Sequence, residues 1–155
     1  MNVLLVDDEK DCLDDILMAL EPTGYKCSAT TSPLEAIEIY KKEKQDVVIS
    51  DVRMPEMNGI DLLKNIRIYD SNARVIIITA YGDLDTAKSA INNRAYAFFG
   101  KPINFSELIL TLRNLEKELA IKNNLNSDYN NLQSEHEKLK VAYEELLNVI
   151  TTIKK

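Results

Sequence analysis

Five short apolar runs that do not alternate with polar residues constrain the fold of this chain more than any other feature of its sequence. They lie in the segments NVLLVDD (2–8), YKCSATT (25–31), DVVISD (46–51), ARVIIITAY (73–81) and AYAFFGKP (95–102). The stretches between them, such as DDILMALEPTGY and NGIDLLKNIRIY, carry apolar residues at helical spacing. Strands that are apolar on both faces belong to parallel sheets covered by helices on both sides. We therefore expect an α/β fold with a doubly wound, five-stranded parallel sheet.

Local signals mark where several of the expected helices begin and end. Ser32 is placed to cap the helix in SPLEAIEIYKKEK, with Pro33 at the first helical position and Glu35 three residues after the cap. Pro22 and Gly24 stop the first helix. The expected helices thus alternate with the strands, as right-handed crossover connections in a parallel sheet require.

Polar side chains lie at the carboxyl ends of four of the five strands. They are Asp7 and Asp8 after the first strand, Asp51 at the end of the third, Thr79 at the end of the fourth and Lys101 after the fifth. Ligands of open α/β sheets bind outside the carboxyl ends of the strands, so we expect these residues to share one crevice. Three carboxylates with a single lysine would repel one another unless a further cation bound there. Because Mg²⁺ prefers carboxylate and phosphate oxygens, the sequence predicts a magnesium site at which Asp51 also meets a phosphoryl group.

Length, charge and cysteine content exclude several classes of protein. The chain has 155 residues and a formal net charge of −6, which favour one domain with an appendage and argue against a general nucleic-acid-binding surface. No apolar segment approaches the roughly 20 residues of a membrane span, and the acidic start does not fit a signal peptide. Cys12 and Cys27 belong to no CxxC motif and are interpreted as free thiols. We expect a cytoplasmic protein that binds neither membranes nor nucleic acid directly.

Four motifs at the strand ends resemble those of a known family. They are DDE at 7–9, SDVRMPEMNG at 50–59, ITAYGD at 78–83 and AFFGKP at 97–102. In this order and spacing they resemble the receiver domain of bacterial two-component response regulators, over about residues 1–120. The resemblance implies a flavodoxin-like sheet with strand order 2-1-3-4-5. It also implies a phosphorylation-dependent signalling switch rather than an enzyme with its own substrate, one that assists only its own phosphorylation and dephosphorylation.

The resemblance assigns roles to the matching residues. Asp51 is expected to accept a phosphoryl group from a sensor histidine kinase or a phosphotransfer protein, with Mg²⁺ as the only cofactor. The expected metal ligands are Asp7, Asp8, Asp51 and the backbone carbonyl of Arg53. Thr79 and Lys101 are expected to bind phosphoryl oxygens, and the bond before Pro102 is expected to be cis.

Three further positions are expected to control the response and its duration. Phe98 matches the aromatic residue whose rotamer follows Thr79, which would alter the face formed by helix four, strand five and helix five. Arg53 and Tyr81 lie two residues beyond Asp51 and Thr79, where the family tunes the aspartyl-phosphate lifetime. Because both side chains are large and should restrict attacking water, we expect a lifetime of minutes or longer.

The sequence departs from the family pattern before the last strand. Arg94 stands where the family usually has glycine, so we expect Asn92 or Asn93 to take the left-handed conformation that ends the preceding helix. Ala97 replaces a commonly acidic residue. These departures affect the output face and leave the pocket residues unchanged.

The last third of the chain reads as one long helix. No proline or glycine occurs from 103 to 155, and Asn104 with Glu107 is placed to cap a helix that starts at Phe105. The first part should pack on the sheet through leucines 108, 112, 115 and 119. A heptad pattern then follows, with Leu125, Leu132, Leu139, Leu146 and Ile153 at d and Tyr129, His136, Tyr143 and Ile150 at a. We expect a receiver domain over 1–120 and a coiled-coil helix over 121–155 that forms a homodimer.

Several alternatives stay open for this helix. The polar stretch KNNLNSDYNN (122–131) shifts the phase of the leucines, which indicates a stammer or a hinge. A single solvated amphipathic helix is the alternative to a coil, and the coil itself could be parallel or antiparallel. The chain could be a free-standing dimeric receiver or part of a longer regulator with an output domain. We interpret His136 as a seam residue rather than a phosphoryl acceptor.

Three rival functions remain. A phosphatase with an aspartyl nucleophile would usually have a second aspartate two residues later, where this chain has Arg53. A nucleotide-binding domain would need a glycine-rich turn after the first strand, and LLVDDEKDCL has no glycine. The third rival is a receiver that acts as an unphosphorylated scaffold.

Overall fold

The computed structural model describes residues 1–80 and 84–153, with side chains for all of these except residues 84 and 147–153. The strands are β1 (Asn2–Val6), β2 (Lys26–Thr30), β3 (Val47–Asp51), β4 (Val75–Thr79) and β5 (Ala97–Gly100). The helices are α1 (Lys10–Leu20), the 3₁₀ turn η1 (Glu21–Thr23), α2 (Pro33–Lys42), α3 (Gly59–Tyr69), α4 (Leu84–Asn92) and α5 (Phe105–Ile153). The chain divides into two compact units, Met1–Leu112 and Arg113–Lys155.

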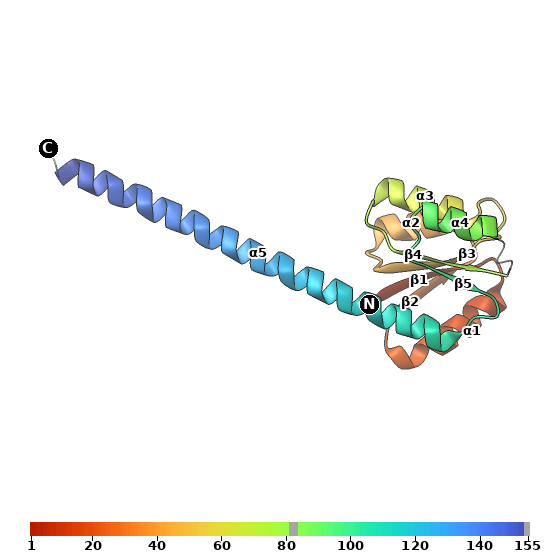
Figure 1. Ribbon diagram of the computed structural model, residues 1–155. Coiled ribbons are helices and arrows are strands. Elements are labelled where there is room, and N and C mark those ends of the chain that lie inside the picture. The colour runs from red at the N-terminus through yellow and green to blue at the C-terminus, as the bar shows by residue number, and fades with distance from the viewer. Residues whose placement is uncertain (81–83, 154–155) are drawn as a thin grey trace. The chain divides into compact units, whose positions relative to one another are not determined.

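The first unit is a five-stranded sheet with the order β2-β1-β3-β4-β5, and each pair of neighbouring strands is parallel. Helices α2, α3 and α4 cover one face, whereas α1 and the first turns of α5 cover the other (Figure 1). The doubly wound α/β fold and the expected strand order are therefore confirmed.

Burial follows the position of each strand in the sheet. All residues of β3 and β4 are buried, as expected for central strands whose two faces both carry apolar side chains. The edge strand β2 differs, because only Thr30 of its five residues is buried. Its sequence KCSAT is correspondingly the least apolar of the five, so the expectation of continuous apolar runs was wrong for this strand.

The cap of α2 differs in part from the expected capping box. The hydroxyl of Ser32 accepts a hydrogen bond from the Glu35 amide at 3.3 Å, as expected. The Glu35 carboxylate, however, accepts from the hydroxyl of Thr30, and the Ser32 amide donates to the Thr30 hydroxyl oxygen at 3.1 Å. Thr30 thus takes the place of the reciprocal bond in the capping box because the end of β2 lies against the start of α2.

The end of α4 corrects the expectation about its left-handed residue. Arg94 itself has φ 59°, and neither Asn92 nor Asn93 has a positive φ. The Arg94 amide donates to Ile91 O at 2.8 Å, and the Ala95 amide donates to Ala90 O at 2.9 Å. These two bonds form a Schellman motif, which needs a left-handed residue at the Arg94 position. The non-glycine residue is tolerated because both bonds are made.

Two further expectations concern the end of β5 and the long helix. The Lys101–Pro102 peptide bond is cis, as expected. The helix α5 has 49 residues, begins at Phe105 as expected, and is capped by a 3.3 Å hydrogen bond from the Glu107 amide to the Asn104 side chain. The polar stretch 122–131 is helical throughout, so the backbone has no break there.

The side chains of α5 divide into buried and exposed groups. Leu108, Leu112 and Leu115 are fully buried, whereas Leu119 is half-buried. The expected heptad residues are exposed as far as their side chains are described: Leu125, Tyr129, Leu132, His136, Leu139, Tyr143 and Leu146. The side chains of Ile150 and Ile153 lie outside the described residues. No described helix combines the length and the apolarity needed to cross a membrane.

Candidate functional site

The parallel register of the sheet brings the polar residues at the strand ends to one edge. Val6 pairs with Ser50, Asp51 with Ile78, and Thr79 with Gly100. Asp7, Asp51, Thr79 and Lys101 are therefore at or next to the carboxyl ends of neighbouring strands. The structure thus brings these four predicted residues together at one edge of the sheet.

Lys101 joins the two buried carboxylates of this edge. Its Nζ lies 2.9 Å from Oδ2 of Asp7 and 3.0 Å from Oδ1 of Asp51. Asp7 is 3% exposed and Asp51 is 6% exposed, so both carboxylates are largely removed from water. Buried charges need partners, and here one ammonium group serves two anions.

Backbone donors and a hydroxyl fix the orientation of both aspartates. Oδ2 of Asp51 accepts a hydrogen bond from the Arg53 amide at 2.7 Å, and Oδ1 of Asp7 accepts from the Glu9 amide at 2.9 Å. The hydroxyl of the fully buried Ser50 donates to the backbone carbonyl of Asp51 at 2.8 Å. Each Asp51 oxygen therefore has a defined partner, and the side chain is held at the end of β3.

Gly59 makes a close approach to the same residue. A Cβ atom added at Gly59 would lie 2.0 Å from the carbonyl oxygen of Asp51, and the Gly59 amide donates to Val52 O at 2.8 Å. Real Cβ atoms do not come so near a backbone oxygen, so only glycine lets α3 start directly against the end of β3. The glycine that ends the sequence motif SDVRMPEMNG is thus required by packing against Asp51.

Thr79 lies at the end of β4, the strand next to β3. Phe98 lies on β5, the strand at the edge of the sheet. Thr79 is 2% exposed, and its backbone carbonyl accepts a hydrogen bond from the Lys101 amide at 2.8 Å. Phe98 pairs with Ile77 in the sheet and is half-buried against the core that includes Ile77 and Ala90. Thr79 is therefore linked directly to Lys101, and Phe98 is neither fully inward nor fully exposed.

The electrostatics of the site follow from burial and from the shared cation. Burial raises the pKa of Asp51 above its usual range, against the lowering effect of Lys101, and the charge of Asp7 adds to the rise. Burial alone would lower the pKa of Lys101, but its hydrogen bonds to Asp7 and Asp51 raise that pKa overall. The site therefore holds a firmly charged lysine beside a carboxylate that is costly to ionise.

Cys12 also belongs to this site, although no motif in the sequence pointed to it. Its Sγ lies 3.7 Å from Nζ of Lys101 and 3.8 Å from Oε2 of Glu9. Burial, followed by the charge of Asp7, raises the pKa of the Cys12 thiol. A half-buried cysteine on the first turn of α1 carries no sequence signal for such proximity, which arises only from the packing of α1 beside the end of β5.

The acidic residues at the strand ends offer oxygen ligands for the expected magnesium ion. Among the residues that the structure describes, no group of three or more histidine, cysteine, aspartate or glutamate side chains is arranged to hold a metal. Mg²⁺ does not need such a group, since it commonly takes one or two carboxylates together with water and phosphate oxygens. Asp7 and Asp51 supply oxygen donors that already attract a cation, Lys101, and they fit this chemistry. Asp8 is exposed and is not part of the ion-paired group.

Of the two residues expected to tune the lifetime of the aspartyl phosphate, the structure describes Arg53 but not Tyr81. The side chain of Arg53 is exposed, and its amide contacts Asp51 as described above. Tyr81 lies outside the described residues. The neighbouring Glu56, in the loop between β3 and α3, has φ 67°. A glutamate with a positive φ so near Asp51 was not expected from the sequence.

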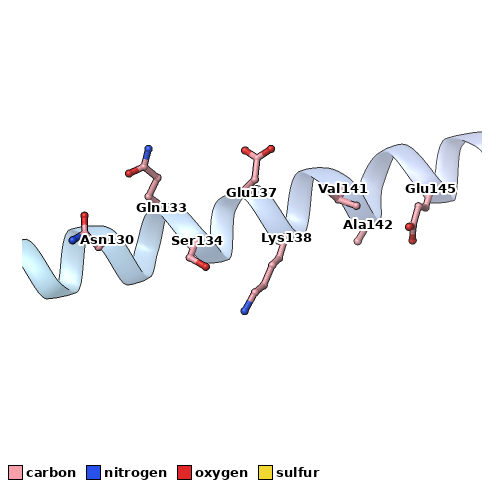
Figure 2. Close-up of a pocket in the computed structure, with 8 residues that line it drawn as sticks. All are labelled: Asn130, Gln133, Ser134, Glu137, Lys138, Val141, Ala142 and Glu145. Atoms are coloured by element: carbon pink, nitrogen blue, oxygen red, sulfur yellow. The ribbon is translucent and has the colours of Figure 1, made fainter.

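One hollow on the molecule is formed by α5 alone (Figure 2). Eight side chains along one side of this helix line it: Asn130, Gln133, Ser134, Glu137, Lys138, Val141, Ala142 and Glu145. They are polar or small apart from Val141, and all of them belong to one helix. Because no second described element closes the hollow, the ion-paired group at the strand ends is the better candidate for the functional site.

The chain resembles known proteins over the whole of its first unit. Residues 3–113 match the response regulator receiver domain family. Sporulation initiation phosphotransferase F of Bacillus subtilis is 34% identical over 123 residues, which are 79% of this chain and 97% of that protein. The transcriptional regulatory protein ZraR of Klebsiella oxytoca is 35% identical over 72% of this chain, but the match spans only 25% of that longer protein.

A solved structure gives the same result. The response regulator protein TrrA of Thermotoga maritima, in complex with Mg²⁺ and beryllium fluoride, aligns with a TM-score of 0.67 and 28% sequence identity. The alignment covers 74% of this chain and 97% of that one.

Proposed function

This chain belongs to the response regulator receiver domain family, and from that membership we propose that Asp51 is the residue that accepts its phosphoryl group. Receiver domains are the phosphorylation-dependent signalling modules of two-component systems, and this is the function of the chain. The observation that carries the assignment to Asp51 is its position: a buried carboxylate at the end of β3, paired with Lys101 at 3.0 Å.

The expected chemistry is transfer of a phosphoryl group to a carboxylate oxygen. An oxygen of Asp51 forms the new bond to phosphorus, while the bond between phosphorus and the donor breaks and its electron pair leaves with the donor. The donor is a phosphohistidine of a sensor histidine kinase or phosphotransfer protein, or a small acyl phosphate. The Arg53 amide holds Oδ2 of Asp51 during the reaction, so the carboxylate is already oriented for in-line attack.

Lys101 and Thr79 are the residues proposed to receive the added charge. The Lys101 ammonium already touches Asp51 and remains beside it as a point charge for a phosphoryl oxygen. The Thr79 hydroxyl is proposed to donate to another phosphoryl oxygen. Phosphorylation adds about −1.5 to −2 charges and three acceptor oxygens, which these donors can satisfy.

Asp7, Asp8, Asp51 and the backbone carbonyl of Arg53 are proposed to hold Mg²⁺. A bound magnesium ion would neutralise charge on the phosphoryl oxygens and on the carboxylates. Asp7 is oriented for this role by the Glu9 amide, which leaves the carboxylate facing Lys101. Asp8 would have to act from its exposed position.

We propose that the response passes from Thr79 to the face formed by α4, β5 and the start of α5. Movement of the buried Thr79 toward the phosphoryl group would free space that the half-buried Phe98 can fill. Arg53 and Tyr81 are proposed to slow hydrolysis of the aspartyl phosphate to minutes or longer. Loss of the phosphoryl group within seconds, followed by intact mass after removal of the donor, would reject that lifetime.

The boundary near residue 120 and the homodimer are also proposals. The receiver domain would extend over 1–120, with a coiled-coil helix over 121–155 as the dimer contact. Large apolar residues at heptad spacing stay exposed along this helix, from Leu125 at 64% to Leu146 at 58%. An exposed apolar stripe of this length is typical of a helix that pairs with another helix.

The central test is treatment with acetyl phosphate and Mg²⁺, read by intact mass. We expect one added phosphoryl group on the native chain and none on Asp51→Asn. Asp14→Asn, which changes an exposed aspartate of α1, should be phosphorylated like the native chain and serves as the matched control. Phosphorylation of Asp51→Asn would move the acceptor to another residue, and sustained turnover of a phosphomonoester would favour the phosphatase alternative.

A further inference from the structure

The last turn of α3 carries an arginine that joins three backbone carbonyls. Nη1 of Arg67 donates to Ala73 O and to Arg94 O, each at 3.3 Å, and Nη2 donates to Ser71 O at 2.5 Å. Ser71 and Ala73 lie between α3 and β4, whereas Arg94 lies just beyond α4. One half-buried guanidinium group therefore ties the turn after α3 to the C-terminal end of α4.

The carbonyl of Arg94 belongs to the cap that closes α4. Arg94 takes the left-handed conformation, and the amides of Arg94 and Ala95 complete the Schellman motif with Ile91 O and Ala90 O. A planar guanidinium group can donate to several carbonyls at once, and its positive charge suits the carbonyl-rich end of a helix. Arg67 therefore stabilises the cap from outside, at a position that requires an uncommon conformation for a residue other than glycine.

The opposite end of α4 is the one nearest the phosphorylation site in sequence. β4 ends at Thr79 and α4 begins at Leu84, so the first turn of this helix is the part of α4 that lies nearest to Thr79 along the chain. The two ends of α4 are thus unequal: the first follows the residue proposed to move, and the last is bonded to α3.

We propose that Arg67 is a positioning residue that fixes the C-terminal end of α4, so that within this helix the response to phosphorylation is confined to the N-terminal turns. The inference rests on the proposed function, because it requires that phosphorylation of Asp51 moves Thr79. Its physical basis is separate, since one hydrogen bond of Arg67 reaches the α4 cap at Arg94 O and the other two anchor the same guanidinium group to the turn after α3.

The test compares amide hydrogen exchange of the full chain, resolved by NMR, with and without Mg²⁺ and beryllium fluoride. In the native chain we expect changed protection at residues 84–89 and unchanged protection at the amides of Arg94 and Ala95. In Arg67→Met we expect these two amides to exchange about tenfold faster and to change further when beryllium fluoride is added. In Arg67→Lys, the ammonium group keeps the charge but lacks the planar fork that reaches carbonyls of two segments, so we expect an intermediate result.

Lys64→Met is the matched control. It removes a cation one turn earlier on α3, where the side chain is paired with Asp61 on the same helix at 2.9 Å. It should leave the exchange pattern of α4 as in the native chain. If Arg67 has a merely structural role, Arg67→Met should speed exchange equally with and without beryllium fluoride. The residues that respond to beryllium fluoride would then be the same as in the native chain.

Two results would overturn the inference. One is a native response that already extends through Arg94 and Ala95, and the other is an Arg67→Met response that stays within residues 84–89. If Arg67→Met does not fold, Arg67→Lys decides between the same outcomes. Failure of the native chain to respond to beryllium fluoride at all, with no phosphorylation by acetyl phosphate, would instead count against the proposed function.

Discussion

Asp51 and Lys101 are subject to opposing effects of burial and charge. Burial makes Asp51 harder to ionise, and the same burial would make Lys101 easier to deprotonate if its two carboxylate partners did not prevent it. The pair is therefore stable as long as both carboxylates share the cation. Removing the cation leaves two buried anions without their partner, which is strongly destabilising.

We predict that Lys101→Met lowers the free energy of unfolding by about 3 kcal/mol. The loss should be smaller when Asp51→Asn is present as well, because one of the two unpaired carboxylates is then neutral. The coupling energy between positions 51 and 101 is measured by a double-mutant cycle. It uses urea unfolding of the native chain, both single variants and the double variant.

Lys64→Met is the control for Lys101→Met. Its ion pair with Asp61 is about half exposed, with side chains 50% and 47% accessible, so we expect a change below about 0.5 kcal/mol. Equal effects of the two substitutions would contradict the view that the Lys101 pairs are distinguished by burial.

The hydroxyl of the half-buried Tyr40 leads us to predict a loss of stability at alkaline pH. Its hydroxyl donates to Oδ2 of Asp70 at 2.8 Å, and burial, followed by this bond, raises the pKa of Tyr40. The folded protein thus holds the Tyr40 proton more tightly than the unfolded chain does. The resulting stability is complete below a pH of about 10 and is lost as the pH rises from there toward the folded pKa.

The measurement is urea unfolding of the native chain and of Tyr40→Phe between pH 8 and pH 11. We expect the variant to be less stable by about 1–2 kcal/mol at pH 8 and the difference to narrow above a pH of about 10. Tyr69→Phe is the control, since it removes the hydroxyl of the exposed ring that lies edge-on to Tyr40 at 6.5 Å. A difference between the native chain and Tyr40→Phe that does not vary with pH would contradict the role of the raised pKa.

Single residues were predictable from the sequence where the strand ends placed them. Four site residues end or follow apolar strands, and parallel pairing brings them to one edge of the sheet: Asp7, Asp51, Thr79 and Lys101. Arg94 was not predictable as the left-handed residue, since propensity favours the neighbouring asparagines and only the Schellman bonds of this helix end choose the position.

At the scale of elements, the apolar runs predicted the central strands better than the edge. β3 and β4 are buried throughout because helices cover both of their faces. Their sequences, VVISD and VIIIT, are accordingly mostly apolar. β2 has only one neighbouring strand, so residues such as Lys26 and Ala29 remain exposed. The role of Thr30 in the α2 cap depends on the contact between two elements, which a pattern along one segment does not contain.

The charges beside the α5 seam predict a parallel coil. In a parallel dimer Glu135 of one copy faces Lys140 of the other, and the pair occurs twice by symmetry. In the antiparallel register that sets each aromatic a residue against a leucine, Glu135 faces Ala142 and Lys140 faces Gln133. We therefore predict that Lys140→Glu weakens dimerisation about tenfold and that Glu135→Lys in the same chain restores it.

Analytical ultracentrifugation of these variants measures the dimer dissociation constants. Lys138→Glu changes a neighbouring cation that lies on the side of α5 away from the seam, and should leave the dissociation constant nearly unchanged. An antiparallel coil would show no rescue by the charge exchange. A native chain that remains monomeric at tens of micromolar would remove the coil altogether.

At the scale of the whole molecule, the sequence predicted the sheet order through a family resemblance and the fold class through the apolar runs. The division of the chain needed a different signal, the change from buried leucines to an exposed heptad stripe along one helix. Leu108 and Leu112 are fully buried, whereas Leu125 and Leu132 are mostly exposed. Since the backbone of α5 is continuous, the two parts differ only in what their side chains contact.

This division predicts that the chain can be shortened after residue 120 of α5 but not after residue 107. A chain that ends after residue 120 keeps every residue of the first unit, Met1–Leu112, and loses the exposed stripe. We expect it to unfold within about 0.5 kcal/mol of the full chain, to be phosphorylated by acetyl phosphate at the same rate, and to be monomeric. The change is small because surface residues away from packed contacts contribute little to stability.

A chain that ends after residue 107 should behave differently. It loses Leu108 and Leu112, and each buried leucine contributes about 2–5 kcal/mol by large-to-small substitution. Because a whole domain is stable by only about 5–15 kcal/mol, we expect this chain not to fold. Circular dichroism and thermal unfolding distinguish the two shortened chains, and sedimentation reports their association. A folded, dimeric chain ending at residue 120 would place the dimer contact on the receiver unit rather than on the stripe, and the assignment of residues 121–155 to the coil would then be wrong.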